Sequence, residues 1–213
     1  MTRSVLLEVQ YLPSVAYFAA LQDAHTLILE KHEHYVKQTY RNRCQVISAQ
    51  GKVDLVVPLT AKHGKISIAE IRVDYSQKWL NNHWRTIQSA YGKAPFFEHY
   101  KEDLEKVLFK KIAFLYDLNR ELLSMCLKWL GRDMTIKDTL TYEKSANSAV
   151  LDLRSAINPK NMAKLVGFYQ PVPYYQVFGN TFAGNVSIID LIFCEGPGAA
   201  RVIRASSIVE MNK

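Results

Sequence analysis

The spacing of hydrophobic and polar residues near the start of the chain predicts two short strands with a helix between them. Residues 4–9 and 25–29 are apolar and β-branched over runs of strand length. The apolar stretch 14–22 follows Pro13, and Ser14 is well placed to cap it, so this stretch is predicted to be helical. A strand, a helix and a second strand within about 30 residues form a βαβ unit, whose two strands lie parallel.

The next part of the pattern predicts an antiparallel hairpin. Segments 39–48 and 53–59 are rich in strand-forming residues, and residues 49–52 between them include the glycine expected of a tight turn. Residues 66–73 are predicted to add a short strand.

From residue 77 the apolar positions recur at three- and four-residue steps, which is the spacing of helices. Residues 174–178 are predicted to form a strand, whereas 141–158 fits neither pattern. The predicted helices cover residues 76–91, 100–114, 117–130, 187–194 and 199–206.

No long linker and no internal repeat interrupts this order of elements. We therefore predict a single α/β domain over residues 1–213. It would contain a mixed sheet, an N-terminal βαβ unit, a hairpin and a helical middle section.

The composition is that of a folded protein, with 48% hydrophobic and 22% charged residues in a chain of 213. No apolar run approaches the ~20 residues of a membrane helix, and the apolar run 5–7 is too short for a signal peptide. We therefore expect a cytoplasmic protein without a transmembrane segment. Cys44, Cys126 and Cys194 are far apart and form no CxxC pair, which argues against a disulfide framework and a zinc site.

The net charge of +7 favours an anionic partner. The basic residues are dispersed and no nucleic-acid-binding motif is present, so nucleic acid is not expected. A phosphorylated small molecule or an anionic membrane surface would use the same charges.

The strongest candidate for ligand binding is the segment around Asn42. If this segment is a strand, Tyr40 and Asn42 face one side, and Arg41 and Arg43 face the other. Guanidinium groups bind phosphate and carboxylate oxygens in a bidentate fork, and Lys37 adds a third cation nearby. The alternative is a strand edge that the arginines keep soluble.

The sequence His32-Glu33-His34 would place two imidazoles on one side of a strand, as a metal site requires. A third ligand would have to come from a residue such as His63 or Glu30. Exposed histidines at a strand–loop junction are the more common explanation of this pattern. Of the two functional interpretations, a single His34 that contributes to a substrate pocket is favoured over a cation site. We therefore expect no metal, and we expect no cofactor because the chain contains no P-loop and no GxGxxG motif.

The predicted helix 76–91 has an unusual mixture of aromatic and polar residues on one face, which includes Trp79, His83 and Tyr91. His83 is expected to be a core histidine with a hydrogen-bond partner. Tyr91 and Lys93, at the exit of the helix, are the better candidates for ligand contact.

Asp190 is the only charge within the apolar helix predicted for residues 187–194. A carboxylate in such a helix is buried and must be paired or hydrogen-bonded. We expect it to bind backbone amides or an arginine; the alternative is that it orients a catalytic group.

Four segments of the chain resemble, in order, motifs of the WbqC-like family of bacterial proteins. Longer members carry an additional helical segment before the last motif, where this chain has only residues 141–160. The four segments are QYLPSVAYF at 10–18, QTYRNR at 38–43, WLNNHWRTIQSAYGKAPFF at 79–97, and SIIDLIF at 187–193 followed by Gly196-Pro197. The resemblance implies one WbqC-like domain over residues 1–213.

The same resemblance implies a role in bacterial surface-polysaccharide synthesis of the O-antigen type, with aminoacyl (glycine) transfer as the activity. The expected protein is a small transferase that acts on a nucleotide-linked or lipid-linked sugar and uses an activated acyl donor. The alternative is a non-catalytic protein that binds the sugar carrier or scaffolds the pathway. The oligomeric state is left open.

For this function we expect His34 to be the general base, with a phosphate of the carrier held by nearby cations. The loop after the first strand, the segment 39–43 and the exit of the helix 76–91 are expected to meet around one cavity. The predicted substrate-binding residues are Gln10, Tyr17, Lys37, Arg41, Asn42, Arg43, Tyr91 and Lys93.

Overall fold

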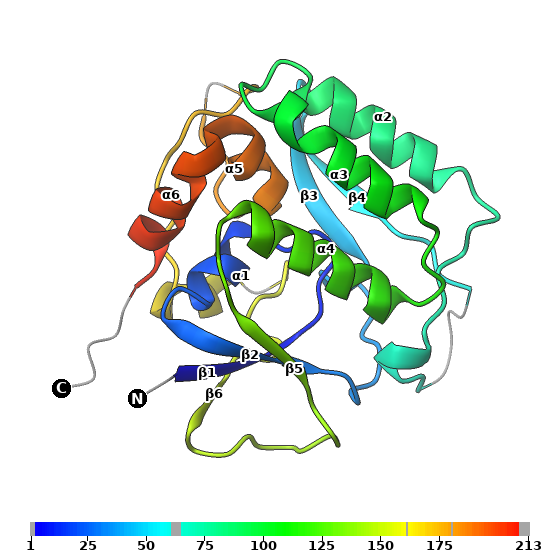
Figure 1. The fold of residues 1–213 in the computed structure, drawn as a ribbon, viewed down its shortest axis with the longest axis vertical. Coiled ribbons are helices and arrows are strands. Elements are labelled where there is room, and N and C mark those ends of the chain that lie inside the picture. Colours follow the sequence, from blue (N-terminus) through cyan, green and yellow to red (C-terminus); the bar gives the residue numbers. More distant parts are fainter. Residues whose placement is uncertain (1–2, 61–64, 161, 180, 209–213) are drawn as a thin grey trace.

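The computed structural model describes residues 3–60, 65–160, 162–179 and 181–208. A sheet of four parallel strands lies at its base, in the order β5–β2–β1–β6 (Figure 1). These strands are β1 (Arg3–Glu8), β2 (Ala24–Glu30), β5 (Thr135–Asp138) and β6 (Val150–Asp152). The chain adds β2 and β5 on one side of β1 and then returns to add β6 on the other side, so the strand order reverses between β1 and β6.

The predicted βαβ unit is confirmed. Helix α1 (Val15–Ala20) connects β1 to β2, and the two strands pair in parallel, with Leu7 opposite Leu29. Figure 1 shows α1, α4, α5 and α6 on one side of the sheet, while the β5–β6 connection runs along the other. Val5 and Leu7 are fully buried, because alternate residues of a strand point to the same face and this face receives the helices.

The predicted hairpin is also confirmed, and it stands apart from the main sheet. Strands β3 (Arg43–Ser48) and β4 (Gly51–Val56) pair antiparallel in a two-stranded sheet of their own. The first strand starts at Arg43 rather than at residue 39, because residues 39–42 form a turn. The alternation of side chains expected for residues 40–43 is therefore wrong.

Besides α1, five α-helices in the described part of the chain cover the sheet and the hairpin, and three of them make up the predicted helical middle. These helices are α2 (Trp79–Tyr91), α3 (Phe97–Phe109), α4 (Leu115–Trp129), α5 (Ile188–Glu195) and α6 (Ala199–Ser206). Helix α3 ends earlier than predicted because the residues after it pair with the segment before α2. The Val73 amide donates to the Ala113 carbonyl at 3.0 Å, and the Leu115 amide donates to the Ile71 carbonyl at 2.9 Å.

Two predicted strands are absent from the described part of the chain. Residues 66–73 contain the short helix η1 (Ile68–Glu70), which Ser67 caps by accepting a hydrogen bond from the Ala69 amide. Residues 174–178 have no regular structure, because the Gln176 side chain bonds to both the amide and the carbonyl of Ala183 in place of a neighbouring strand. Two further short helices are η2 (Met162–Gly167) and η3 (Gly196–Gly198). No helix within the described ranges is long and apolar enough to cross a membrane.

Candidate active-site cleft

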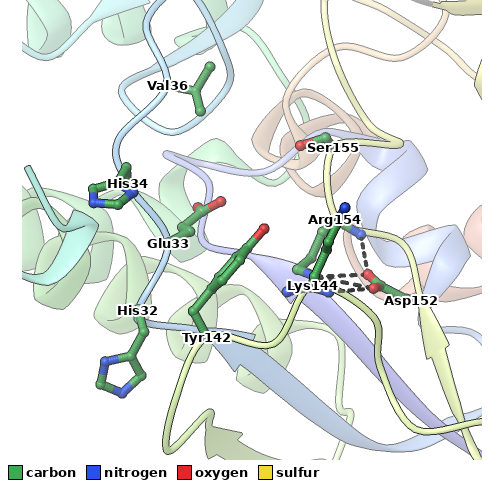
Figure 2. A pocket seen from close by; sticks show the side chains of 9 residues that line it. All are labelled: His32, Glu33, His34, Val36, Tyr142, Lys144, Asp152, Arg154 and Ser155. Carbon is green, nitrogen blue, oxygen red and sulfur yellow. Dashed lines mark hydrogen bonds and ion pairs between the residues drawn. The ribbon is translucent and has the colours of Figure 1, made fainter. Parts of the chain in front are cut away.

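A cavity of about 680 Å³ opens where the parallel strands end (Figure 2). In open parallel sheets, ligands bind outside the carboxyl ends of the strands, at the point where the strand order reverses. The cavity is lined by residues that follow β2, residues of the β5–β6 connection and residues at the end of β6; we call it the cleft. Its lining residues are His32, Glu33, His34, Val36, Tyr142, Lys144, Asp152, Arg154 and Ser155.

One wall of the cleft rests on a buried ion pair between Glu33 and Arg41. The Nε and Nη2 atoms of Arg41 donate to the two carboxylate oxygens of Glu33 at 2.7 and 2.6 Å. Only 1% of Arg41 is exposed, and its Nη1 lies 4.0 Å from Oε1 of Glu8. Burial raises the pKa of Glu33, although the hydrogen bonds from Arg41 oppose this. The bidentate pair therefore fixes the Glu33 side chain at the edge of the cleft.

The opposite wall is organised by Arg154. Its Nε and Nη2 atoms donate to the Asp152 carboxylate, and its Nη1 donates to Glu30 at 2.9 Å and to the Glu143 carbonyl at 2.8 Å. The guanidinium also lies over the ring of Tyr142, 5.3 Å from the ring centroid. Hydrogen bonds from Arg154 lower the pKa of Asp152. Arg154 thus connects β2, β6 and the β5–β6 connection.

Glu8, the last residue of β1, and Gln10, just after it, connect the two walls. Glu8 accepts a hydrogen bond from the Ser155 amide at 2.8 Å and one from Gln10 Nε2 at 3.3 Å. The same Gln10 nitrogen also donates to the Ile157 carbonyl at 3.2 Å. The end of β1 therefore positions the loop after β6. In Figure 2, Glu33 and His34 lie across the cleft from Arg154, with Tyr142 between them.

The model of the WbqC-like protein family matches residues 9–168. The chain belongs to this family. The matched range includes all three segments that line the cleft, and it ends before α5 and α6.

This member of the WbqC-like family is also similar to an uncharacterised protein of Mycobacterium tuberculosis, Rv1507c. The two are 27% identical over 147 residues, which is 67% of this chain and 62% of the relative. The chain thus spans less than two thirds of the length of that relative. No solved structure matches this chain.

The structure distributes the predicted site residues of this family member among several places. His34 lines the cleft, while Arg41 and Gln10 are buried beside it. Tyr17 is fully buried, and its hydroxyl donates to the Glu8 carbonyl at 3.2 Å. Gln10, Tyr17 and Arg41 each contact Glu8 at the end of β1.

The other predicted residues lie elsewhere. Lys37, Asn42 and Arg43 line a second cavity of about 340 Å³. Tyr91 is buried, and Lys93 is exposed just after α2 and lines neither cavity.

The buried carboxylate of Asp190 is hydrogen-bonded, but to different partners from those expected. The hydroxyls of Tyr91 and Tyr174 donate to it at 3.0 and 2.6 Å, and Gln176 Nε2 donates at 3.0 Å. Burial raises the pKa of Asp190, and these hydrogen bonds oppose the effect. Two tyrosines and a glutamine take the place of the expected arginine and backbone amides, because Tyr91 at the end of α2 and the segment 174–176 lie against α5.

Several residues of the cleft were missed by sequence reasoning, above all Asp152 and Arg154. They belong to the stretch 141–158, whose pattern was ambiguous because β6 has only three residues. The available signal was a short apolar run, Val150-Leu151, followed at once by charged residues. No group of His, Cys, Asp and Glu among the described residues could hold a metal ion, and His63 lies outside those residues.

Proposed function

We propose that this protein transfers an activated acyl group, of the aminoacyl class, to an amine of a nucleotide-linked or lipid-linked sugar. The observation that carries the proposal is the position of His34. It lines the same cavity as the buried Glu33, at the carboxyl end of a parallel sheet where the strand order reverses.

In the proposed reaction the amine nitrogen attacks the acyl carbonyl carbon. His34 removes a proton from that nitrogen, and the resulting tetrahedral intermediate carries a negative oxygen. Lys144, which lines the opposite part of the cleft, supplies a positive charge for this oxygen. The bond between the carbonyl carbon and the leaving group then breaks, His34 returns the proton to the leaving group, and an amide remains.

The ion pairs of the cleft support such chemistry by keeping the walls in place. Arg41 holds Glu33 through two hydrogen bonds, and Arg154 holds Asp152 and stacks on Tyr142. Side chains fixed in advance lose little entropy when a ligand binds. The Glu33 carboxylate is already neutralised by Arg41, so its role is to hold this wall of the cleft.

A second candidate function is binding without turnover. It is favoured by the fact that the arginines beside the cleft, Arg41 and Arg154, already bind carboxylates. A protein that only recognises a sugar carrier needs no further reactive group. For either function, the cytoplasm and bacterial surface-polysaccharide synthesis of the O-antigen type are the proposed setting, and family membership supports it.

The test is an amide-forming assay with a glycyl thioester and a nucleotide-linked amino sugar, followed by mass spectrometry of the product. We expect His34→Gln to lower kcat at least a hundredfold, since a positioned base typically contributes 10²–10⁴-fold. His99→Gln is the matched control, because His99 is exposed on α3 and lines neither cavity. Equal turnover by His34→Gln and the parent protein would remove His34 as the base. Binding of the amino sugar without any product would support the binding function instead.

A further inference from the structure

The second cavity lies behind the segment that forms one wall of the cleft. Consecutive side chains of this segment serve opposite sides: His34 and Val36 line the cleft, whereas Tyr35 and Lys37 line the second cavity. The two cavities therefore share one wall but no lining residue. Strand β4 and the residues after it provide an apolar surface in the second cavity.

Asn42 lines this cavity, and its side-chain amide has a fixed orientation. Its Nδ2 donates to the Val57 backbone carbonyl at 2.9 Å, and this bond determines which end of the side-chain amide is oxygen. The backbone carbonyl of Asn42 accepts from the Val57 amide at 2.8 Å, which holds the backbone of the two residues together. Asn42 is 6% exposed, and its Oδ1 accepts no hydrogen bond from the described residues. A buried acceptor without a partner is unusual and indicates a missing donor.

Two cations accompany this acceptor. Lys37 is exposed at the mouth of the cavity, and Arg43 is partly buried within it. The Nε of Arg43 is buried and makes no hydrogen bond within the described part of the chain. Its Nη1 is 3.9 Å from Asp54, which is too long for a strong ion pair. Arg43 can therefore accept an additional anionic partner.

We propose that the second cavity is a binding site for a sugar phosphate, independent of the reaction in the cleft. The phosphate binds Lys37 and Arg43, because guanidinium and ammonium groups are strong donors to phosphate oxygens. A sugar hydroxyl donates to Oδ1 of Asn42, and the carbon face of the sugar packs on the exposed Val56 and on Pro58. Oδ1 of Asn42 and Nε of Arg43 are shielded from solvent, so ligand entry includes a small displacement of the lining side chains.

The site is tested by calorimetry with glucose 1-phosphate, inorganic phosphate and UDP-glucose as probes. Glucose 1-phosphate is expected to bind more tightly than inorganic phosphate, because inorganic phosphate has no sugar hydroxyl to donate to Asn42 and no carbon face to pack on Val56. Equal affinities for these two probes would overturn the role given to Asn42. UDP-glucose and glucose 1-phosphate share the sugar and the phosphate. The probe that binds more tightly indicates whether the site takes a nucleotide-linked sugar or a free sugar phosphate.

Variants that remove charged side chains test whether glucose 1-phosphate binds in the second cavity. The double variant Lys37→Gln/Arg43→Gln should weaken glucose 1-phosphate binding by about tenfold or more, as expected for lost charged hydrogen bonds. Asp54→Asn should tighten it severalfold, because Asp54 competes with the phosphate for Arg43. Lys106→Gln, which removes a charge on α3, is the matched control and should change nothing.

His34→Gln should leave this affinity within about twofold of that of the parent, since His34 lines only the cleft. A large loss with His34→Gln and none with the Lys37/Arg43 double variant would place the sugar phosphate in the cleft and overturn the proposal. Neither result depends on whether the protein is a transferase.

Discussion

Arg41 and Arg43 are two residues apart and carry the same charge, yet their surroundings differ completely. The Arg41 side chain is 1% exposed and lies between Glu33 and Glu8. The Arg43 side chain is 25% exposed and faces Asp54 at the edge of the hairpin. Burial and pairing, rather than residue type, thus decide what each arginine does.

We expect Arg41→Gln to lower the free energy of unfolding by about 3–5 kcal/mol, because it leaves Glu33 buried without its cation. Arg43→Gln should change stability by less than about 1 kcal/mol, because its contact with Asp54 is long, at 3.9 Å, and Asp54 is itself exposed to solvent. Urea unfolding of both variants measures the difference. Equal unfolding midpoints for the two variants would contradict the importance of the buried pair. A double variant that lacks both arginines would therefore lose stability as well as any ligand binding.

At the scale of elements, α5 is the helix around which the others are assembled. Residues Ile188 to Phe193 are fully buried, so neighbours surround the helix on every side. It ends at Gly196, whose φ of 52° and ψ of −124° suit only glycine. The ring of Phe96 lies against Gly196, and the Phe96 amide donates to the Phe193 carbonyl at 2.9 Å. The end of α5 thereby fixes the connection between α2 and α3.

Gly196→Ala should be strongly destabilising, because its Cβ would overlap the Phe96 ring in addition to the backbone strain. The backbone strain alone costs about 1–2 kcal/mol and overpacking adds roughly 1–3 kcal/mol. Gly131→Ala is the control: Gly131 also has a positive φ, of 63°, but nothing lies within 4 Å of an added Cβ. Thermal unfolding should show the larger loss for Gly196→Ala. A loss of stability no greater than that of Gly131→Ala would mean that the Phe96 ring moves aside at little energetic cost.

At the scale of the whole molecule, His83 joins parts that are distant in the sequence. Its Nδ1 lies 3.1 Å from the Tyr11 hydroxyl in the loop after β1, and its ring packs edge-on against Trp79. Burial lowers the pKa of His83 to about 4 from its usual 6.5, although a hydrogen bond with the backbone of Val56 opposes the shift. The folded protein therefore keeps His83 neutral where the unfolded chain would protonate it.

This difference predicts a loss of stability in acid. Between pH 6.5 and about 4 the unfolded state binds a proton that the folded state does not, so stability falls as the pH falls. A shift of this size corresponds to roughly 3 kcal/mol. The measurement is the free energy of unfolding against pH for the parent protein and for His83→Gln, which should lack this dependence.

The comparison of the parent with His83→Gln separates the titration of His83 from that of other groups. The folded pKa values of Glu33 and Asp190 are raised by burial, so these groups stabilise the fold as the pH falls and act against His83. Both remain in the variant, and their contributions cancel in the difference. Parallel pH curves for parent and variant would show that His83 does not titrate as inferred.

The sequence by itself determined the local elements and the family. The βαβ unit, the hairpin and the positions of α2, α4, α5 and α6 follow from periodicity, because apolar positions repeat with the period of the structure that buries them. The burial of Asp190 and His83 followed in the same way, since both lie on apolar faces of predicted helices. These features depend on neighbours within a few residues along the chain.

Only the tertiary structure decided how these elements produce a site. The reversal of the strand order beside β1 brings Asp152 and Arg154 opposite Glu33 and His34, from segments more than a hundred residues apart. The turn at residues 39–42 sends Arg41 inward and leaves Asn42 and Arg43 at a second cavity. Such contacts arise from the pairing of distant segments and from the desolvation of their charges, and neither leaves a periodic pattern in the local sequence.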